Sequence, residues 1–106
     1  GNELKGKLFF CTITAGGPKQ AYQIGAFHNL TINQLLTPLK QTAALCKMIT
    51  LPPFVVHGTH AMEDDEILDF KNDYVGLLKT IVDDKLDIEK VRKLDYLNHY
   101  LIKEEL

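Results

Sequence analysis

Residues 13–31, which read ITAGGPKQAYQIGAFHNLT, combine residue types that are more typical of a binding loop than of a plain connector. The segment holds three of the chain's seven glycines, including Gly16 and Gly17, and these residues allow a ligand to approach the backbone closely. Tyr22 supplies a hydroxyl, and His28 supplies a group that can exchange a proton near neutral pH. On spacing alone, the simpler interpretation is a tyrosine that packs its ring and a histidine at the surface.

His57 and His60 form a second candidate group, an H-x-x-H at the end of a predicted strand. On an extended segment these two side chains are poorly placed to share a metal ion, and no further ligands cluster nearby. We therefore predict no metal site. We expect His99 to be a solvated helix residue, and the EDDE run at residues 63–66 to start a helix rather than to bind a cation.

Composition and charge exclude several classes of function. The chain has 106 residues, 45% of them hydrophobic and 25% charged, with a net charge of −2, so no field draws it to nucleic acid or to a membrane. Residues 1–60 hold five Lys against one Glu, whereas residues 61–106 hold seven Lys and Arg against thirteen Asp and Glu, a balance typical of a solvated helical surface. Cys11 and Cys46 are expected as core thiols. Reduced thiols, together with the lack of a recognisable signal peptide or membrane-spanning run, predict a cytoplasmic protein.

Alternating strands and helices must position these residues. KLFFCTIT at residues 7–14 is almost continuously apolar and predicts a strand buried on both faces. A second strand is predicted at about residues 54–59, after two prolines. Between them, residues 32–48 have helical spacing, with Thr31 as the N-cap and a kink or restart at Pro38.

Two further helices follow the second predicted strand. The acidic stretch MEDDEILDF opens a long helix that DDKLD, at residues 83–87, terminates, and a last helix is predicted from about residue 88 to residue 104. Strands that alternate with helices predict a parallel sheet with helices on its faces. Because two strands alone would leave ladder edges unpaired and apolar faces wet, we expect the sheet to continue outside these residues.

The order of these motifs resembles one protein family. An apolar strand ending in TAGG, then a tyrosine, a histidine six residues later, a kinked LTPLKQTAALCKM helix and an LPPFVVHG strand are similar to the flavodoxin-like NAD(P)H:quinone oxidoreductases. That family includes quinone reductases, modulator-of-drug-activity proteins and ancillary proteins of potassium efflux. The resemblance runs from about residue 2 to residue 82. It implies an α/β fold with a doubly wound parallel sheet, of which this chain is an incomplete C-terminal portion with two strands and three to four helices.

The same resemblance divides the chain and assigns its candidate site. Residues 1–83 would be the C-terminal portion of a flavin-binding domain, and residues 84–106 a helical extension. The residues that would line the ring of FMN or FAD are Thr14, Ala15, Gly16, Gly17 and Tyr22. Ala15 stands where some relatives carry a second threonine. The glycine N–H groups would stabilise the charge that develops on the flavin when it is reduced.

Tyr22 and His28 match the tyrosine and histidine that the quinone reductases place beside the flavin, where the tyrosine hydroxyl hydrogen-bonds the ring and the histidine helps to neutralise its reduced form. The resemblance thus implies a homodimeric oxidoreductase that passes a hydride from NAD(P)H through the flavin to a quinone or similar electrophile. One alternative is a regulatory binding module that acts on a membrane transport protein, and another is an inactive fragment. FMN versus FAD and NADH versus NADPH stay open, because these residues contain no determinant for the phosphate end.

Overall fold

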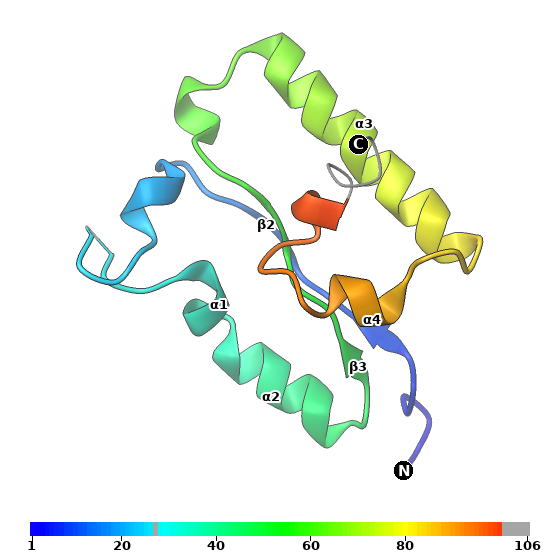
Figure 1. Cartoon of the computed structure of the whole chain (residues 1–106). Coiled ribbons are helices and arrows are strands. Elements are labelled where there is room, and N and C mark those ends of the chain that lie inside the picture. The colour runs from blue at the N-terminus through cyan, green and yellow to red at the C-terminus, as the bar shows by residue number, and fades with distance from the viewer. Residues whose placement is uncertain (27, 101–106) are drawn as a thin grey trace.

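Two long strands cross the molecule side by side, and helices lie on either side of them (Figure 1). The computed structural model describes residues 1–26 and 28–100. Each strand is interrupted once, giving β1 (Leu8–Phe9) and β2 (Thr12–Thr14) in the first and β3 (Ile49–Thr50) and β4 (Phe54–Val56) in the second. β1 pairs with β3, and β2 pairs with β4, both in parallel. The predicted parallel arrangement is confirmed.

The interruption coincides with Pro52–Pro53. The register changes from Leu8 opposite Ile49 to Thr12 opposite Phe54, so the second strand has one more residue than the first between the paired segments. Proline has no N–H to donate to a ladder, and the extra residue falls where the two prolines stand.

The second strand ends earlier than the sequence pattern predicts. Its last paired residue is Val56, whereas the prediction extended to residue 59. Gly58 has a φ of 69°, a left-handed conformation that glycine adopts without strain. This residue turns the chain out of the sheet into the short 3-10 helix η2 (Thr59–Ala61), and the prediction was wrong at this end.

The connection between the two strands contains α1 (Ile32–Leu35) and α2 (Thr37–Leu45). The Thr31 hydroxyl accepts a hydrogen bond from the Gln34 N–H at 3.0 Å, and the Gln34 side chain accepts one from the Thr31 N–H at 2.8 Å. This capping box confirms Thr31 as the N-cap. Pro38 lies in the first turn of α2, where its missing N–H has no intrahelical role, so the predicted restart of the helix is also confirmed.

The long helix α3 (Asp64–Val82) begins and ends where its sequence predicts. Glu63 caps it, and three acidic residues occupy its first turn, where the helix dipole favours negative charge. At the other end Asp84 has a φ of 56°, which no helix can continue through. The EDDE run is therefore a helix start, as expected.

The last predicted helix is much shorter than its apolar spacing indicated. α4 spans only Ile88–Val91, and residues 92–97 form turns before a helical segment at residues 98–100. The rest of the predicted helix, residues 101–104, lies outside the described residues. Val91, Leu97 and Tyr100 are all buried. Their apolar spacing therefore arises because the chain folds back after α4 and buries these side chains from different segments, and not because they share one face of a helix.

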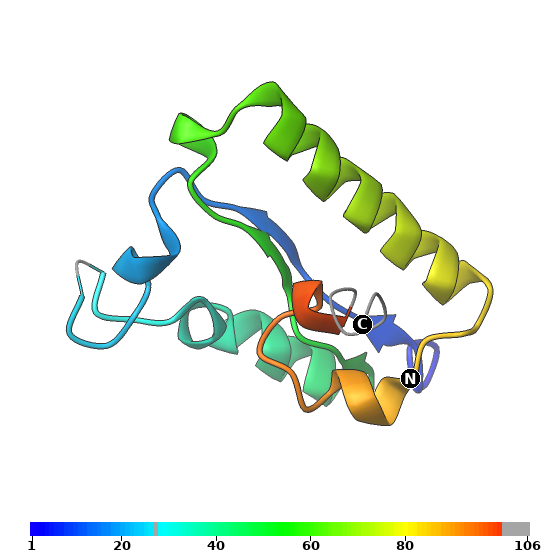
Figure 2. The ribbon, with the colours of Figure 1, turned by 45° about the horizontal axis from the view of Figure 1, so that its top comes forward.

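Two core clusters lie on opposite faces of the strands, which pass between α3 and the α1–α2 pair (Figure 2). On one face Phe54 packs with Leu77 of α3, and on the other Val55 packs with Ile32 and Leu36. Because successive strand residues point to opposite faces, the apolar run of β4 can supply both clusters. Leu97, beyond the predicted domain boundary at residue 83, belongs to the same cluster as Leu77, and that boundary stays a prediction.

The outer edge of β4 is closed by the segment that follows α4. The Val55 N–H donates to Asn98 Oδ1 at 3.0 Å, and Asn98 Nδ2 donates to the Val55 carbonyl at 2.9 Å. The Leu97 N–H donates to the Pro53 carbonyl at 2.8 Å. These bonds use the groups that another strand would need, so the sheet does not extend on this side.

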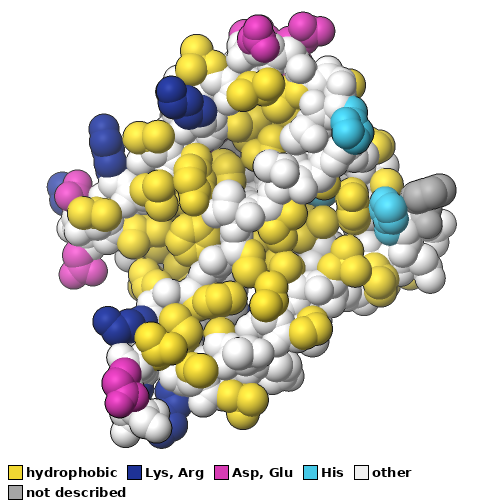
Figure 3. All heavy atoms as spheres, turned by 180° about the vertical axis from the view of Figure 1, so that it is seen from behind, with side chains coloured by type: hydrophobic (Ala, Val, Ile, Leu, Met, Phe, Trp, Pro, Cys, Tyr) yellow, Lys and Arg dark blue, Asp and Glu magenta, His cyan; other side chains and the backbone are white. Residues whose placement is uncertain are grey.

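The opposite edge is different, because within residues 1–26 and 28–100 no segment pairs with the free side of β1 and β2. Beside it lies an apolar hollow of about 340 Å³ between β2 and α3, lined among others by Phe54, Phe70 and Tyr74. Thr12 and Thr14 line it as well and are exposed, so the first strand is not buried on both faces within this chain. Figure 3, the view from behind, shows hydrophobic side chains across the middle of that side. Continuation of the sheet at this edge stays a prediction.

Over the same described ranges, none of the helices combines the length and the apolar character that a membrane span requires.

Replacing Asn98 with alanine tests the closed edge. The substitution leaves the Val55 N–H and carbonyl without partners, and we expect the free energy of unfolding to fall by about 1–3 kcal/mol. Urea denaturation followed by circular dichroism measures it. Asn72→Ala, on the exposed surface of α3, is the matched control and should change stability little. An Asn98→Ala protein as stable as the parent would contradict this account of the edge.

Candidate functional site

The loop after β2 is held by hydrogen bonds that continue the ladder beyond the last strand residues. The Ala15 N–H donates to the Val56 carbonyl at 2.9 Å, and the Thr59 N–H donates back to the Ala15 carbonyl at 3.1 Å. One step further, the Gly58 N–H donates to the Gly17 carbonyl at 2.8 Å. The carboxyl ends of both strands are thereby tied together, and the glycine loop has a defined backbone conformation.

The N–H groups of Gly16 and Gly17 make no hydrogen bond within the described part of the chain, so they can donate to a ligand. A side chain at Gly16 would collide with the imidazole of His60, which lies directly against this residue. Ala15 is buried, with 8% of the residue exposed. Thr14 lines the apolar hollow on the α3 side, whereas Tyr22 lines a different pocket, described below. His60 is a neighbour of Gly16 that the sequence did not indicate, and the ring-lining role of Thr14, Ala15, Gly16, Gly17 and Tyr22 stays a prediction.

Tyr22 and His28 are brought together by a closed loop. The His28 N–H donates to the Ala21 carbonyl at 2.9 Å, and the Gly25 N–H donates to Asn29 Oδ1 at 2.6 Å. The rings of Tyr22 and His28 stack with centroids 4.5 Å apart and an interplanar angle of 23°. Their spacing in the sequence therefore produces a real pair beside the glycine loop, while their role stays a prediction.

His57 is a functional candidate that the sequence interpretation missed. Its ring lies 5.6 Å from that of Tyr22, and its Nε2 is 3.2 Å from the hydroxyl of Tyr96. Its Nδ1 is buried and has no hydrogen-bond partner in the described structure. Burial, followed by the positive charge of Lys19, lowers the pKa of His57, so the neutral imidazole is favoured. Its position directly after a strand of a parallel sheet is the signal that could have identified it.

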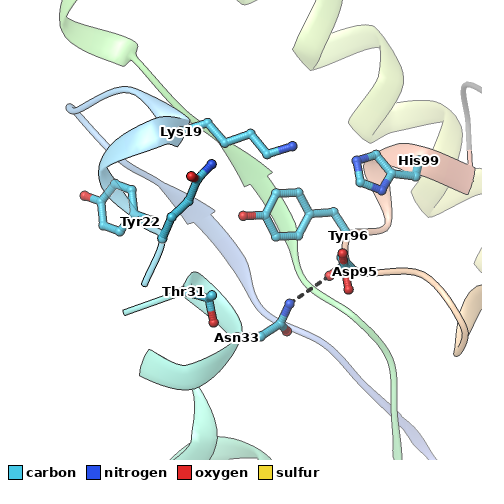
Figure 4. A pocket seen from close by; sticks show the side chains of 8 residues that line it. Lys19, Tyr22, Thr31, Asn33, Asp95, Tyr96 and His99 are labelled. Carbon is cyan, nitrogen blue, oxygen red and sulfur yellow. Dashed lines mark hydrogen bonds between the residues drawn. The ribbon is translucent and has the colours of Figure 1, made fainter. Parts of the chain in front are cut away.

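A pocket of about 270 Å³ separates the loop from the C-terminal segment (Figure 4). One wall comes from η1 (Lys19–Ala21) and the residues that follow it, and the other comes from residues 95–99. The lining residues are Lys19, Tyr22, Gln23, Thr31, Asn33, Asp95, Tyr96 and His99.

Several contacts hold the second wall of this pocket in place. The ring of His99 stacks on that of Tyr96 at 5.5 Å, and Lys19 Nζ lies 5.4 Å from the Tyr96 ring centroid. Asn33 Nδ2 donates to the Asp95 carbonyl at 3.1 Å and joins α1 to this segment. His99 lies in the helical segment at residues 98–100, as expected, but it is half-buried in these contacts rather than solvated. Burial, followed by the Asp95 carboxylate, raises the pKa of the Tyr96 hydroxyl.

The cysteines and the H-x-x-H histidines do not form a common site. Cys11 and Cys46 are free thiols, as expected, but both are half-buried rather than core residues. Burial raises the pKa of the Cys11 thiol. His57 contacts Tyr96, whereas His60 lies against the glycine loop. Among the residues that the structure describes, no group of three His, Cys, Asp or Glu side chains is arranged to hold a metal ion.

The ionisation of His57 can be measured by an NMR titration of its imidazole. We expect a pKa below about 6.5, the ordinary value for histidine. Lys19→Met should raise it toward that value without exceeding it, since burial is the larger cause and is unchanged. Because the pKa is lowered in the folded state, the unfolded chain binds more protons, and the contribution of His57 to stability is lost as the pH falls below about 6.5.

Lys40→Met is the control, because Lys40 acts on Cys11. A His57 pKa that does not change in Lys19→Met would contradict the assigned cause.

Comparisons with known proteins agree with this geometry. A protein-family model described as a flavodoxin-like fold matches residues 1–77. A Bacillus subtilis (strain 168) protein named uncharacterized NAD(P)H oxidoreductase YdeQ is 35% identical over 81 residues, which are 76% of this chain and 41% of that protein. The glutathione-regulated potassium-efflux system ancillary protein KefG of Cronobacter sakazakii is 33% identical over 67 residues, which are 63% of this chain and 36% of KefG.

A solved structure shares the arrangement as well. It is described as a thermophilic tryptophan halogenase from Streptomycin violaceusniger, and it matches with a TM-score of 0.67 and 31% identity over 70% of this chain and 43% of that one. The chain thus spans about two fifths of the relatives that it matches. The family match covers both strands, the glycine loop and most of α3, and the chain therefore belongs to the family of proteins with the flavodoxin-like fold.

Proposed function

We propose that this chain is part of a flavin-dependent NAD(P)H oxidoreductase, in which it supplies the loop that contacts the flavin ring. The observation that carries the proposal is the stacked Tyr22–His28 pair in the same loop as two glycines whose N–H groups are available. In doubly wound sheets ligands bind beyond the carboxyl ends of the strands, and this loop follows such an end. A relative named as an NAD(P)H oxidoreductase supports the class of reaction.

The residues present fit a flavin ring. A flat ring can lie on a backbone without side chains, and the unpaired N–H groups of Gly16 and Gly17 match the acceptor atoms at its polar edge. When bound, the flavin would accept a hydride from the nicotinamide and pass reducing equivalents to a quinone or similar electrophile. FMN and FAD share this ring, so either fits the contacts that this chain offers.

Each side chain has a separate task in this proposal. The glycine N–H groups are fixed dipoles that stabilise negative charge without reorganising. The Tyr22 hydroxyl makes no hydrogen bond within the described residues and can donate one to the ring. The imidazole of His28 can act as a proton donor and offset the charge that appears on reduction.

A second candidate is a regulatory binding module that forms a homodimer and acts on a membrane transport protein. The similarity to KefG, which is named as an ancillary protein of a potassium-efflux system, favours it. Both candidates share the flavin-binding loop, and turnover distinguishes them.

The test uses the full-length protein to which this chain belongs. We expect it to purify with a bound flavin, visible in its absorption spectrum, and to oxidise NADH or NADPH when a quinone is supplied. The control is the same assay without the quinone under anaerobic conditions. Bound flavin without turnover would support the binding module instead, and absence of flavin at any added concentration would exclude both.

Tyr22 and His28 should affect turnover more than flavin retention, because they stabilise charge that develops only on reduction. In the full-length protein, Tyr22→Phe and His28→Ala should each slow flavin reduction or reoxidation by up to about a hundredfold, the usual contribution of acid–base assistance. Stopped-flow absorbance measures both half-reactions, and flavin content should stay near that of the parent.

Tyr74→Phe is the matched control, since its hydroxyl bonds Thr12 away from the loop. Parental rates in both site variants would make the pair purely structural. Loss of the flavin would mean that these side chains, rather than the glycine backbone, bind it.

A further inference from the structure

We infer that Tyr96 and His57 form a hydrogen-bonded pair that positions Tyr22, so that Tyr96 is a positioning residue for the oxidoreductase site. Tyr96 lies outside residues 1–77, to which the family model is matched. The inference rests on the proposed function, and it assigns a role to the C-terminal segment that the family match does not supply.

The segment that carries Tyr96 is fixed to the sheet rather than loosely attached. The next two residues, Leu97 and Asn98, make three hydrogen bonds to the backbone of residues 53–55. Leu97 is fully buried on the α3 side. Tyr96 instead packs with the cluster on the other side of the strands, so the segment passes around the edge of β4 and delivers this ring to the face on which Tyr22 lies.

Tyr96 provides the one hydrogen bond that holds the imidazole of His57 in the described structure. The distance from Nε2 to the phenolic oxygen is 3.2 Å, while Nδ1 is buried without a partner. The rings of His57 and Tyr96 lie 5.8 Å apart and are tilted by 35°. The phenol is therefore the one polar contact, within the described residues, that distinguishes one orientation of the imidazole from its flipped form.

Tyr22 is held by packing against the cluster of Ile32, Leu36 and Val55 and by its neighbouring rings. Its hydroxyl makes no hydrogen bond within residues 1–26 and 28–100, and its two ring contacts are with His28 at 4.5 Å and His57 at 5.6 Å. His28 comes from the same exposed loop, whereas His57 directly follows β4. The pair of His57 and Tyr96 thus adds a second link between the Tyr22 ring and the sheet, beside its packing on the core cluster.

The experiment is Tyr96→Phe in the full-length protein, which removes one oxygen and keeps the ring. We expect unchanged flavin content and an unchanged KM for NAD(P)H, with flavin reduction slower by about tenfold, less than the hundredfold that a displacement of one ångström can cost. A second readout needs no flavin. The nitrogen NMR signals of the His57 imidazole in the flavin-free protein should shift or broaden as the ring loses its partner.

Tyr100→Phe is the matched control, because it makes the same change in the same segment but on the α3 face of the sheet. Parental reduction rates and parental His57 signals in Tyr96→Phe would overturn the inference, and so would an equal loss of rate in Tyr100→Phe, which would indicate general loosening of the segment. A parent protein without flavin or turnover would instead overturn the proposed function itself, with the His57 signals still reporting whether the pair forms.

Discussion

The arrangement of the site depends on the parallel pairing of two strands and on its continuation past their ends. The bonds from Ala15 to Val56 and from Thr59 back to Ala15 join backbone groups, so they fix the loop conformation through the main chain. The glycine loop, the exit of β4 and the 3-10 turn that carries His60 are all positioned by this ladder. A loop held in this way can keep N–H donors oriented in advance, which is the condition for stabilising developing charge.

The C-terminal segment has two physical roles that are linked. Asn98 and Leu97 satisfy the outer edge of β4, which would otherwise present unpaired groups to solvent or to another strand. The same segment passes from one face of the sheet to the other and brings Tyr96 to His57. A chain can pass from one face of a sheet to the other only around an edge strand. Residues 95–99 therefore both close the edge of β4 and complete a wall of the pocket.

The open edge of β1 and β2 and the apolar hollow beside it lie on the other side of the molecule. The relatives are more than twice as long as the part that this chain matches. A strand that paired with this edge and a helix that covered the hollow would bury the exposed threonine face of β2, which is how doubly wound sheets are built. In the proposed function, the site would be one side of a larger one, and this chain would contribute the ring contacts that come from the loop after β2.

The sequence by itself determined the local elements, because their signals are local. Thr31 and Gln34 form a capping box, Pro38 restarts a helix and the acidic turn starts α3, and each can be read from neighbouring residues. Tyr22 and His28 could be named as candidates through the family resemblance, whereas the stacking of their rings was established only by the structure. The tertiary structure alone decided that residues 92–97 leave the helical pattern and that Tyr96 meets His57, 39 positions away. Apolar spacing indicates that a side chain is buried, but it does not indicate which segment the side chain packs against. For residues 96–98, that segment is specified only by their hydrogen bonds to the edge of β4.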